Sequence, residues 1–270
     1  MVVVSALSGY LFMGGSSWYE VMLLMVGGML LTAASNGSNQ IWERELDKLM
    51  KRTQNRPLPL NQMSLTEAYG VVVFCLVVGL VMLSMLNWAS FWLGVAAYIS
   101  YVFIYTPMKR KSPWAVFIGA FPGAIPPMLG AIAATGEFGF TPGILFFVQF
   151  CWQFPHFWAI AWVVDEDYRA GGFSLLPSKE GKGKSSAFQI LVYSLALIPF
   201  SLLPWWFGMT SDVTMYVVTI MGGAFFYLSY RLFLTLEDKD AKSLMFASFI
   251  YLPIIQFVYV FDKIEGSIPF

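Results

Sequence analysis

Eight long apolar runs divide the sequence, and they constrain its fold more than any other feature. Each run has about the 20 residues that a helix needs to cross the roughly 30 Å hydrocarbon core of a bilayer. Only 12% of the residues are charged, whereas an ordinary soluble domain has roughly 25%. We therefore predict an all-α integral membrane protein that forms a single domain over residues 1–270. The runs cover residues 18–38, 65–86, 88–107, 113–134, 141–164, 186–207, 213–234 and 242–261, and a shorter run at 2–13 makes a ninth predicted helix.

The basic residues indicate how these helices are oriented. Of the 16 Lys and Arg residues, 15 fall at or after the ends of the second, fourth, sixth and eighth predicted helices, and only Lys263 follows the ninth. Alternate loops therefore face one side, which the positive-inside rule makes cytoplasmic. We expect a multi-pass protein of the plasma (inner) membrane, with its N-terminus inside and its C-terminus outside. The 15 residues are Arg44, Lys48, Lys51, Arg52, Arg56, Lys109, Arg110, Lys111, Arg169, Lys179, Lys182, Lys184, Arg231, Lys239 and Lys242.

The first run and the two cysteines give weaker information. The run at 2–13 has no basic stretch before it and no small-residue cleavage site, so we expect no secretory signal peptide. It is shorter than a spanning helix, so we expect that the start codon is misplaced or the first helix is incomplete. Cys75 and Cys151 lie inside apolar runs without metal-ligand spacing, which indicates packing residues. The net charge of zero gives no indication of nucleic-acid binding.

The most polar stretch, NQIWERELDKLMKRTQNRPLP at residues 39–59, follows the first long run. Asn39, Glu43 and Asp47 are spaced four residues apart, which on a continuing helix stacks their oxygen atoms along one stripe. Oxygen ligands suit Mg²⁺, which takes few protein carboxylates and completes its shell with water and phosphate. The alternative is a solvated helix end with i,i+4 ion pairs. Arg52 and Arg56 favour a binding site, because their forked donors match phosphate oxygens.

Two further loops are expected on the same side of the membrane. In YTPMKRKSPW at 105–114, the spacing can place Tyr105 and Lys109 on one side of a helix end, where a phenol and an ammonium could hold a diphosphate. Arg110 and Lys111 are interpreted as positive-inside anchors. Asp165, Glu166 and Asp167 form a second acidic cluster, and two facing clusters could hold more than one Mg²⁺. The cluster at 165–167 could equally be a solvated loop.

The only histidine, His156, lies in CWQFPHFWAIAWVVDEDYRAGG at 151–172. If a helix starts at Pro155, His156 and Asp167 fall near one face, about 16 Å apart along the axis. The carboxylate would then lie at the membrane surface and the imidazole deep in the membrane. An ionisable group at that depth is a functional candidate, although a neutral histidine in a polar helix interface is equally compatible with the sequence.

These motifs resemble the UbiA-type intramembrane prenyltransferases, and within that family the branch that farnesylates protoheme IX. The resemblance is close over about residues 20 to 185 and loose in the C-terminal helices. One departure is that the wider family spaces the aspartates of its second motif four residues apart, whereas Val163 stands four residues before Asp167. The matching stretches are NQIWERELDKLMKRTQNRPL, YTPMKRKSPW, GAFPGAIPPMLGAIAATG and WQFPHFWAIAWVVDEDYRAGGFSLLP.

The resemblance implies a bundle of about nine transmembrane helices around a central cavity, with a diphosphate at its cytoplasmic mouth. It implies transfer of the farnesyl group of farnesyl diphosphate to the vinyl group of haem B, through an allylic carbocation, and a downstream haem A synthase or terminal oxidase assembly. His156 would face the acceptor or the reacting tail. The implied Mg²⁺ ligands are Asn39, Glu43, Asp47 and Asp167, and the implied diphosphate-binding residues are Arg52, Arg56, Tyr105 and Lys109.

Other functions remain open at this point. A related transferase could prenylate a quinone precursor or a chlorin ring instead of haem. A polytopic transporter would also contain intramembrane polar groups, but transporters often place these near the midplane, whereas here they cluster at helix ends. A structural assembly factor without chemistry is the remaining alternative.

Overall fold

The computed structural model describes residues 1–178 and 180–266, so Lys179, one of the 15 basic residues above, lies outside the described part. The described residues form helices joined by loops, of which the longest, residues 48–64, connects α2 to α3, with one isolated β-bridge between Thr210 and Lys263. The elements are α1 (Val2–Phe12), α2 (Trp18–Asp47), α3 (Leu65–Leu86), α4 (Trp88–Ile99), the π-helix η1 (Ser100–Tyr105), α5 (Thr106–Met108), α6 (Ala115–Thr135), α7 (Phe140–Val163), α8 (Asp165–Ala170), α9 (Lys184–Ser201), α10 (Leu203–Trp206), α11 (Asp212–Thr235) and α12 (Asp238–Phe261).

The predicted spanning helices are confirmed. Eight helical segments in the described part are long and apolar enough to cross a membrane, and each coincides with one predicted run. The ninth, α1, has 11 residues. Two predicted helices are composite: residues 88–107 form α4, η1 and α5, and the run at 186–207 breaks into α9 and α10. Pro107 and Pro204 lie in the first turns after these breaks. Proline lacks the N–H that a continuous helix needs, so each of them interrupts the helical hydrogen bonding.

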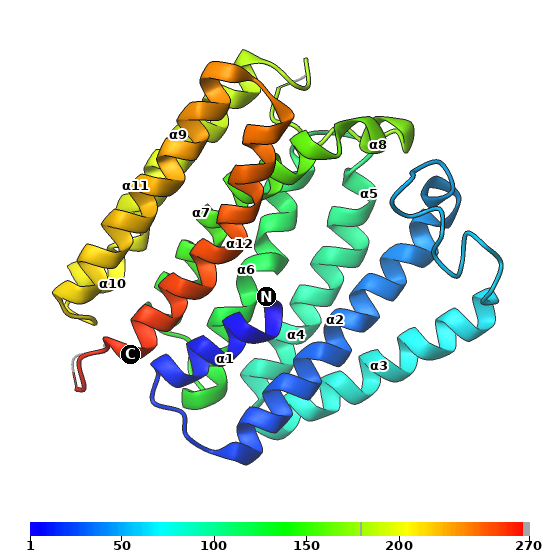
Figure 1. Cartoon of the computed structure of the whole chain (residues 1–270). Coiled ribbons are helices and arrows are strands. Elements are labelled where there is room, and N and C mark those ends of the chain that lie inside the picture. The colour runs from blue at the N-terminus through cyan, green and yellow to red at the C-terminus, as the bar shows by residue number, and fades with distance from the viewer. Residues whose placement is uncertain (179, 267–270) are drawn as a thin grey trace.

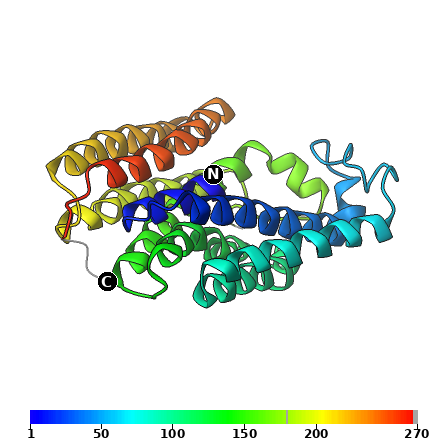
Figure 2. The same ribbon diagram turned by 90° about the horizontal axis from the view of Figure 1, so that it is seen from below.

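Successive long helices run in opposite directions, so their ends gather at two opposite faces of the bundle (Figure 1). Helices α9, α11 and α12 form one side of the bundle, whereas α2 and α3 form the other (Figures 1 and 2). Helices α6 and α7 lie between them. Their most apolar windows are 67% and 72% buried, against 22% for α3. The core therefore lies along α6 and α7, while α3 presents most of its surface outward.

Three loops and their flanking helix ends meet at one face, which we call the motif end and define as residues 39–59, 105–114, 162–178 and 180–183. Polar contacts tie it to the start of α12. Lys182 Nζ lies 2.8 Å from Asp238 Oδ1, and Trp162 Nε1 donates to the same oxygen at 3.1 Å. The alternation of helix direction thus brings together polar stretches that are far apart in sequence.

The middle of α6 depends on side chains from α7 for its hydrogen bonding. Pro122, Pro126 and Pro127 lie inside α6, and each removes one helical donor. Pro127 leaves the carbonyl of Gly123 without its normal partner, and Gln149 Nε2 donates to that oxygen at 2.7 Å. A backbone group inside a membrane must be satisfied by protein, so Gln149 allows the proline-containing segment to remain helical.

Helix α1 packs against α6 with its backbone almost in contact. A Cβ added at Gly130 would lie 1.7 Å from the carbonyl oxygen of Ala6, and one added at Gly9 would lie 2.0 Å from that of Pro127. Small residues allow this close approach of membrane helices. The position of α1 is therefore fixed by glycines on both helices.

We expect Gly130→Ala to lower the free energy of unfolding by about 1–3 kcal/mol, because the added methyl group would force α1 away from α6. Thermal unfolding of the purified protein in detergent measures this change. Gly223→Ala in α11 is the matched control, since a Cβ there meets no atom within 4 Å and alanine favours a helix. Equal unfolding temperatures for the two variants would contradict this account of α1.

Candidate functional site

The polar stripe on α2 is present as predicted. The helix continues to Asp47, and its last three turns carry Asn39, Glu43 and Asp47, with exposed fractions of 8%, 6% and 0%. All three line a cavity of about 310 Å³ at the motif end. We call it the charged pocket; its lining also includes Arg52, Arg56, Tyr105 and Lys109, together with Asn36, Gln40, Met50, Tyr101, Tyr168 and Phe173.

Each buried carboxylate of the stripe has one cationic partner. Lys109 Nζ donates to Glu43 Oε2 at 2.8 Å and lies 2.6 Å from Oε1. Arg56 Nη1 donates to Asp47 Oδ2 at 2.7 Å. Buried charges require such partners, because removing one member of a pair leaves the other uncompensated, at a cost of about 3–5 kcal/mol. The ion pairs therefore stabilise an acidic stripe that would otherwise be costly to bury.

One carboxylate oxygen of the stripe has no partner. Asp47 Oδ1 is buried and accepts no hydrogen bond from the described residues, whereas Glu43 Oε1 lies in the ion pair with Lys109. Buried polar atoms normally have partners, so Asp47 Oδ1 is available to a ligand. No group of three or more His, Cys, Asp or Glu side chains in the described residues could hold a metal ion. The available set of two carboxylates and one carboxamide still fits Mg²⁺, which binds through one or two carboxylates plus substrate phosphates.

The basic and aromatic residues of the pocket affect one another. Lys109 Nζ lies 5.3 Å from the ring centroids of both Tyr105 and Phe173, so the predicted proximity of Tyr105 and Lys109 is found. Burial lowers the pKa of Lys109 below its usual value, while the Glu43 carboxylate acts in the opposite direction. Burial also raises the pKa of Tyr168, which keeps its phenol neutral at physiological pH.

Asp167 lies beside the charged pocket but is not in its lining. Its Oδ1 accepts a hydrogen bond from the backbone N–H of Lys51 at 3.0 Å, and its Oδ2 accepts one from that of Arg52 at 2.9 Å. Arg52 in turn lies over the ring of Tyr168, 5.8 Å from its centroid. The structure therefore shows Asp167 holding the loop that carries Arg52, rather than facing the stripe on α2. Helix α7 ends at Val163, and Asp167 lies on the separate short helix α8.

His156 also lies outside the lining of the charged pocket, and its expected position facing the acceptor or the reacting tail stays a prediction. Helix α7 does not start at Pro155 but runs from Phe140 through it. His156 stacks on Trp152 with ring centroids 4.3 Å apart, and its Nδ1 lies 2.6 Å from Ser248 Oγ on α12. The following residue, Phe157, takes the cavity-facing position, so the roughly 100° step between helix neighbours turns His156 toward α12.

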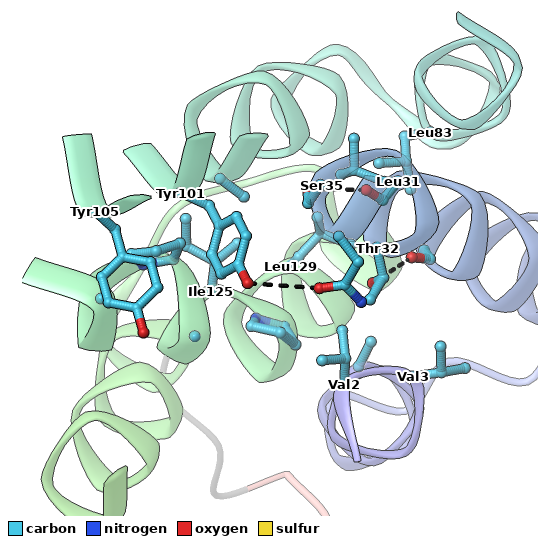
Figure 3. A pocket seen from close by; sticks show the side chains of 18 of the residues that line it. Val2, Val3, Leu31, Thr32, Ser35, Leu83, Tyr101, Tyr105, Ile125 and Leu129 are labelled. Carbon is cyan, nitrogen blue, oxygen red and sulfur yellow. Dashed lines mark hydrogen bonds between the residues drawn. The ribbon is translucent and has the colours of Figure 1, made fainter. Parts of the chain in front are cut away.

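A second, apolar cavity of about 320 Å³ continues inward from the charged pocket. We call it the apolar chamber. Asn36, Tyr101 and Tyr105 line both cavities, and Figure 3 shows the two tyrosines at one end of the chamber, with Leu31, Leu83 and Leu129 farther along it. Gly28, Pro122 and Pro126 also line it. The site thus combines a charged mouth with a long apolar interior.

The sequence pattern of the UbiA prenyltransferase family matches residues 2–252, which is most of the chain. The chain belongs to the UbiA prenyltransferase family. A protein from Cytophaga hutchinsonii named protoheme IX farnesyltransferase is 46% identical over 266 residues, which cover 97% of this chain and 93% of that protein. The resemblance stated from the sequence motifs is thereby confirmed, and the chain is a multi-pass membrane prenyltransferase.

Solved structures agree with the UbiA fold. A structure of a digeranylgeranylglyceryl phosphate synthase superposes with a TM-score of 0.78 at 18% identity, covering 97% of this chain and 92% of the other. A UbiA homologue from Archaeoglobus fulgidus bound to GPP and Mg²⁺ superposes with a TM-score of 0.63 at 15% identity, covering 96% and 95%. At these identities the likeness establishes the architecture of this UbiA prenyltransferase, a helical bundle around an interior cavity.

The motif analysis missed five polar or aromatic residues that line the charged pocket of this UbiA prenyltransferase: Asn36, Gln40, Tyr101, Tyr168 and Phe173. Two could have been found from spacing. Asn36 stands three residues before Asn39, and Tyr101 four before Tyr105, so each falls on the same helix face as a residue already identified. Tyr168 follows Asp167 directly, and nothing in the sequence indicates that α8 turns it toward the pocket.

We expect Asp167→Asn to loosen the loop at residues 48–56, because the amide offers one acceptor oxygen where the carboxylate offers two with negative charge. Limited trypsin digestion in detergent measures this directly, through cleavage after the exposed Lys51 and Arg52. We expect cleavage several-fold faster than in the wild type. Glu166→Gln on the same short helix is the control, and equal cleavage of both variants would contradict the assigned contact.

Proposed function

We propose that this enzyme transfers the farnesyl group of farnesyl diphosphate to the vinyl group of haem B, in an Mg²⁺-dependent reaction. The observation that carries the proposal is the continuity of the charged pocket with the apolar chamber through Asn36, Tyr101 and Tyr105. An isoprenoid diphosphate has the same division into a charged head and an apolar tail. The identity to a named protoheme IX farnesyltransferase supports the choice of donor and acceptor.

In this proposal Asn39, Glu43 and Asp47 hold Mg²⁺, and the diphosphate lies against them. The unpartnered Oδ1 of Asp47 supports this assignment, as does the A. fulgidus homologue bound to GPP and Mg²⁺. Bound Mg²⁺ supplies positive charge that stabilises the departing diphosphate. The diphosphate is also bound by the basic residues and the phenol that line the pocket, namely Arg52, Arg56, Lys109 and Tyr105.

The chamber controls what happens after the diphosphate leaves. Departure of the diphosphate breaks the bond to C1 and generates an allylic farnesyl cation. The ring faces of Tyr101 and Tyr105, at the junction of the two cavities, stabilise positive charge there, and the apolar walls exclude stray water. The haem vinyl group attacks C1 and forms the new carbon–carbon bond. Water then adds to the resulting cation and releases a proton, which gives the hydroxyethylfarnesyl group.

Asp167 and His156 act from outside the pocket in this proposal. Asp167 keeps Arg52 at the mouth of the charged pocket through its two backbone hydrogen bonds. His156 stabilises the packing of α7 against α12 through Ser248. Both are therefore positioning residues, and neither is assigned as a metal ligand or as a group that contacts the acceptor.

The proposal also includes an orientation in the membrane. The motif end contains most of the basic residues, so the positive-inside rule places it at the cytoplasmic face of the inner membrane. Helix α12 begins beside the motif end and runs to the opposite face, so in this orientation the end of α12 and the C-terminus after it are outside. The product is consumed by a downstream haem A synthase or during assembly of a terminal oxidase.

The first test is a transfer assay with purified protein in detergent, haem B, farnesyl diphosphate and Mg²⁺. Mass spectrometry should detect a hydroxyethylfarnesyl adduct that disappears with a chelator. We expect Asp47→Asn to lower the rate by at least 100-fold, because it removes charge from the metal site and from the partner of Arg56. Prenylation of an aromatic acid instead of haem B would overturn the acceptor assignment, and a chelator-insensitive reaction would overturn the metal assignment.

A second prediction concerns the apolar chamber. Gly28 lines it, and a Cβ added there meets no atom within 4 Å, so Gly28→Leu should fill the chamber without disturbing the fold. We expect kcat/KM for farnesyl diphosphate to fall at least 10-fold, while that for the shorter geranyl diphosphate changes less. Gly70→Leu in α3 is the control, because Gly70 is also free of neighbours and does not line the chamber. Parallel losses for both donors would contradict the chamber assignment.

A further inference from the structure

A short π-helix, η1, stands directly behind the polar stripe on α2. It covers Ser100–Tyr105, and Thr106 follows as the first residue of α5. π-helical turns are rare and occur frequently at functional sites. In η1 the backbone N–H of Thr106 donates to the carbonyl of Tyr101, five residues earlier. At this wider turn of the backbone, the side chain of Thr106 points toward α2, where it contacts Asn39.

The hydroxyl group of Thr106 has a fixed direction of hydrogen bonding. Its Oγ1 lies 3.0 Å from the carbonyl oxygen of Tyr101. A carbonyl oxygen can only accept, so the single hydroxyl proton of Thr106 is used in this bond. Toward any other neighbour, Thr106 Oγ1 can therefore act only as an acceptor.

The other neighbour of Thr106 Oγ1 is the side chain of Asn39. The donor is Asn39 Nδ2, at 3.3 Å. Because Oγ1 has no proton left, it would repel the amide oxygen, so the carboxamide must present its nitrogen to Thr106. The oxygen Oδ1 then lies on the other edge of the planar amide group, and none of the described residues donates a hydrogen bond to it.

The two cavities beside Asn39 support this orientation of its carboxamide group. Asn39 lines the charged pocket, whereas Thr106 does not. Thr106 instead lines a neighbouring cavity, together with Trp42, Pro107 and Arg110. Glu43 lines both cavities. The carboxamide therefore lies between Thr106 on one side and the charged pocket on the other. Hard cations bind a carboxamide through oxygen, so only one of its two orientations suits a metal site.

We propose that Thr106 is a positioning residue that fixes the carboxamide of Asn39 so that Oδ1 faces the charged pocket as a ligand for a divalent cation. The inference rests on the proposed function, because it assigns a role to Thr106 within the proposed metal site. Groups that orient metal ligands from behind typically change metal affinity by about 10- to 100-fold when they are removed.

The test compares Thr106→Val, which keeps the shape but removes the hydroxyl, with Thr106→Ser, which keeps the hydroxyl. Calorimetric titration of Mg²⁺ into full-length protein with inorganic diphosphate measures affinity without turnover. We expect about 10- to 100-fold weaker binding for Thr106→Val and near wild-type binding for Thr106→Ser. Ser100→Ala is the matched control, since Ser100 Oγ also donates to a backbone carbonyl near η1, at 2.6 Å, without contacting Asn39.

A second variant tests the direction of the hydrogen bond and does not depend on the stability of Thr106→Val. Asn39→Asp adds negative charge, which by electrostatics alone should strengthen Mg²⁺ binding. The inferred geometry instead places a carboxylate oxygen against the acceptor-only Oγ1 of Thr106, so we expect weaker binding. In the double variant with Thr106→Val this conflict is removed, and Asn39→Asp should then bind Mg²⁺ at least as tightly as Thr106→Val alone.

The outcomes separate this inference from the proposed function. Wild-type protein that binds no Mg²⁺ with diphosphate would overturn both the metal site and the role of Thr106. Wild-type binding with an unchanged affinity in Thr106→Val, or tighter binding by Asn39→Asp, would overturn the role of Thr106 alone. Equal weakening by Thr106→Val and Ser100→Ala would also overturn it, because the effect would then come from the helix and not from Asn39.

Discussion

The buried carboxylates of Glu43 and Asp47 impose the strongest constraint on this structure. A carboxylate at the end of a membrane helix must be compensated, and α2 supplies no cation on the same face. The partners come from elsewhere: Lys109 from the segment after α5, and Arg56 from the loop after α2. These pairs determine where two segments of the motif end must lie. Asp167 then fixes the loop of Arg56 to α8, so three carboxylates hold the segments of the motif end together.

A different constraint shapes the interior. An apolar chamber inside a helix bundle requires that the surrounding helices leave space and still satisfy their backbones. Prolines in α6 free carbonyl groups, and Gln149 from α7 satisfies one of them. The glycines that join α1 to α6 bring these helices into backbone contact. A few short-range contacts at the edges of the chamber thus hold its walls in place. Gly28 lines the chamber without a side chain and therefore leaves space inside it.

The sequence predicted the helices and the stripe on α2 because both depend on local periodicity. Apolar runs determine the spans, and the spacing of Asn39, Glu43 and Asp47 determines a helix face. The alternation of basic loops correctly predicted that polar stretches far apart in sequence lie at one end of the bundle. The direction of His156 could not be predicted, since it depends on α7 continuing through Pro155. The contacts of Asp167 required the break at Val164, and the role inferred for Thr106 depends on a π-turn that no periodicity shows.

The paired state of the charged pocket has a consequence for how a ligand enters. Lys109 and Arg56 pair with Glu43 and Asp47, so these carboxylates have counterions within the protein. In the proposed function, a magnesium diphosphate would exchange these ion pairs: the metal would bind the carboxylates, and Lys109 and Arg56 would bind the phosphate oxygens. Entry and departure would thus leave the local charge nearly balanced at every stage. Such a site would attract its ligand over long range less strongly than its basic residues suggest, and would release the diphosphate by letting the original pairs form again.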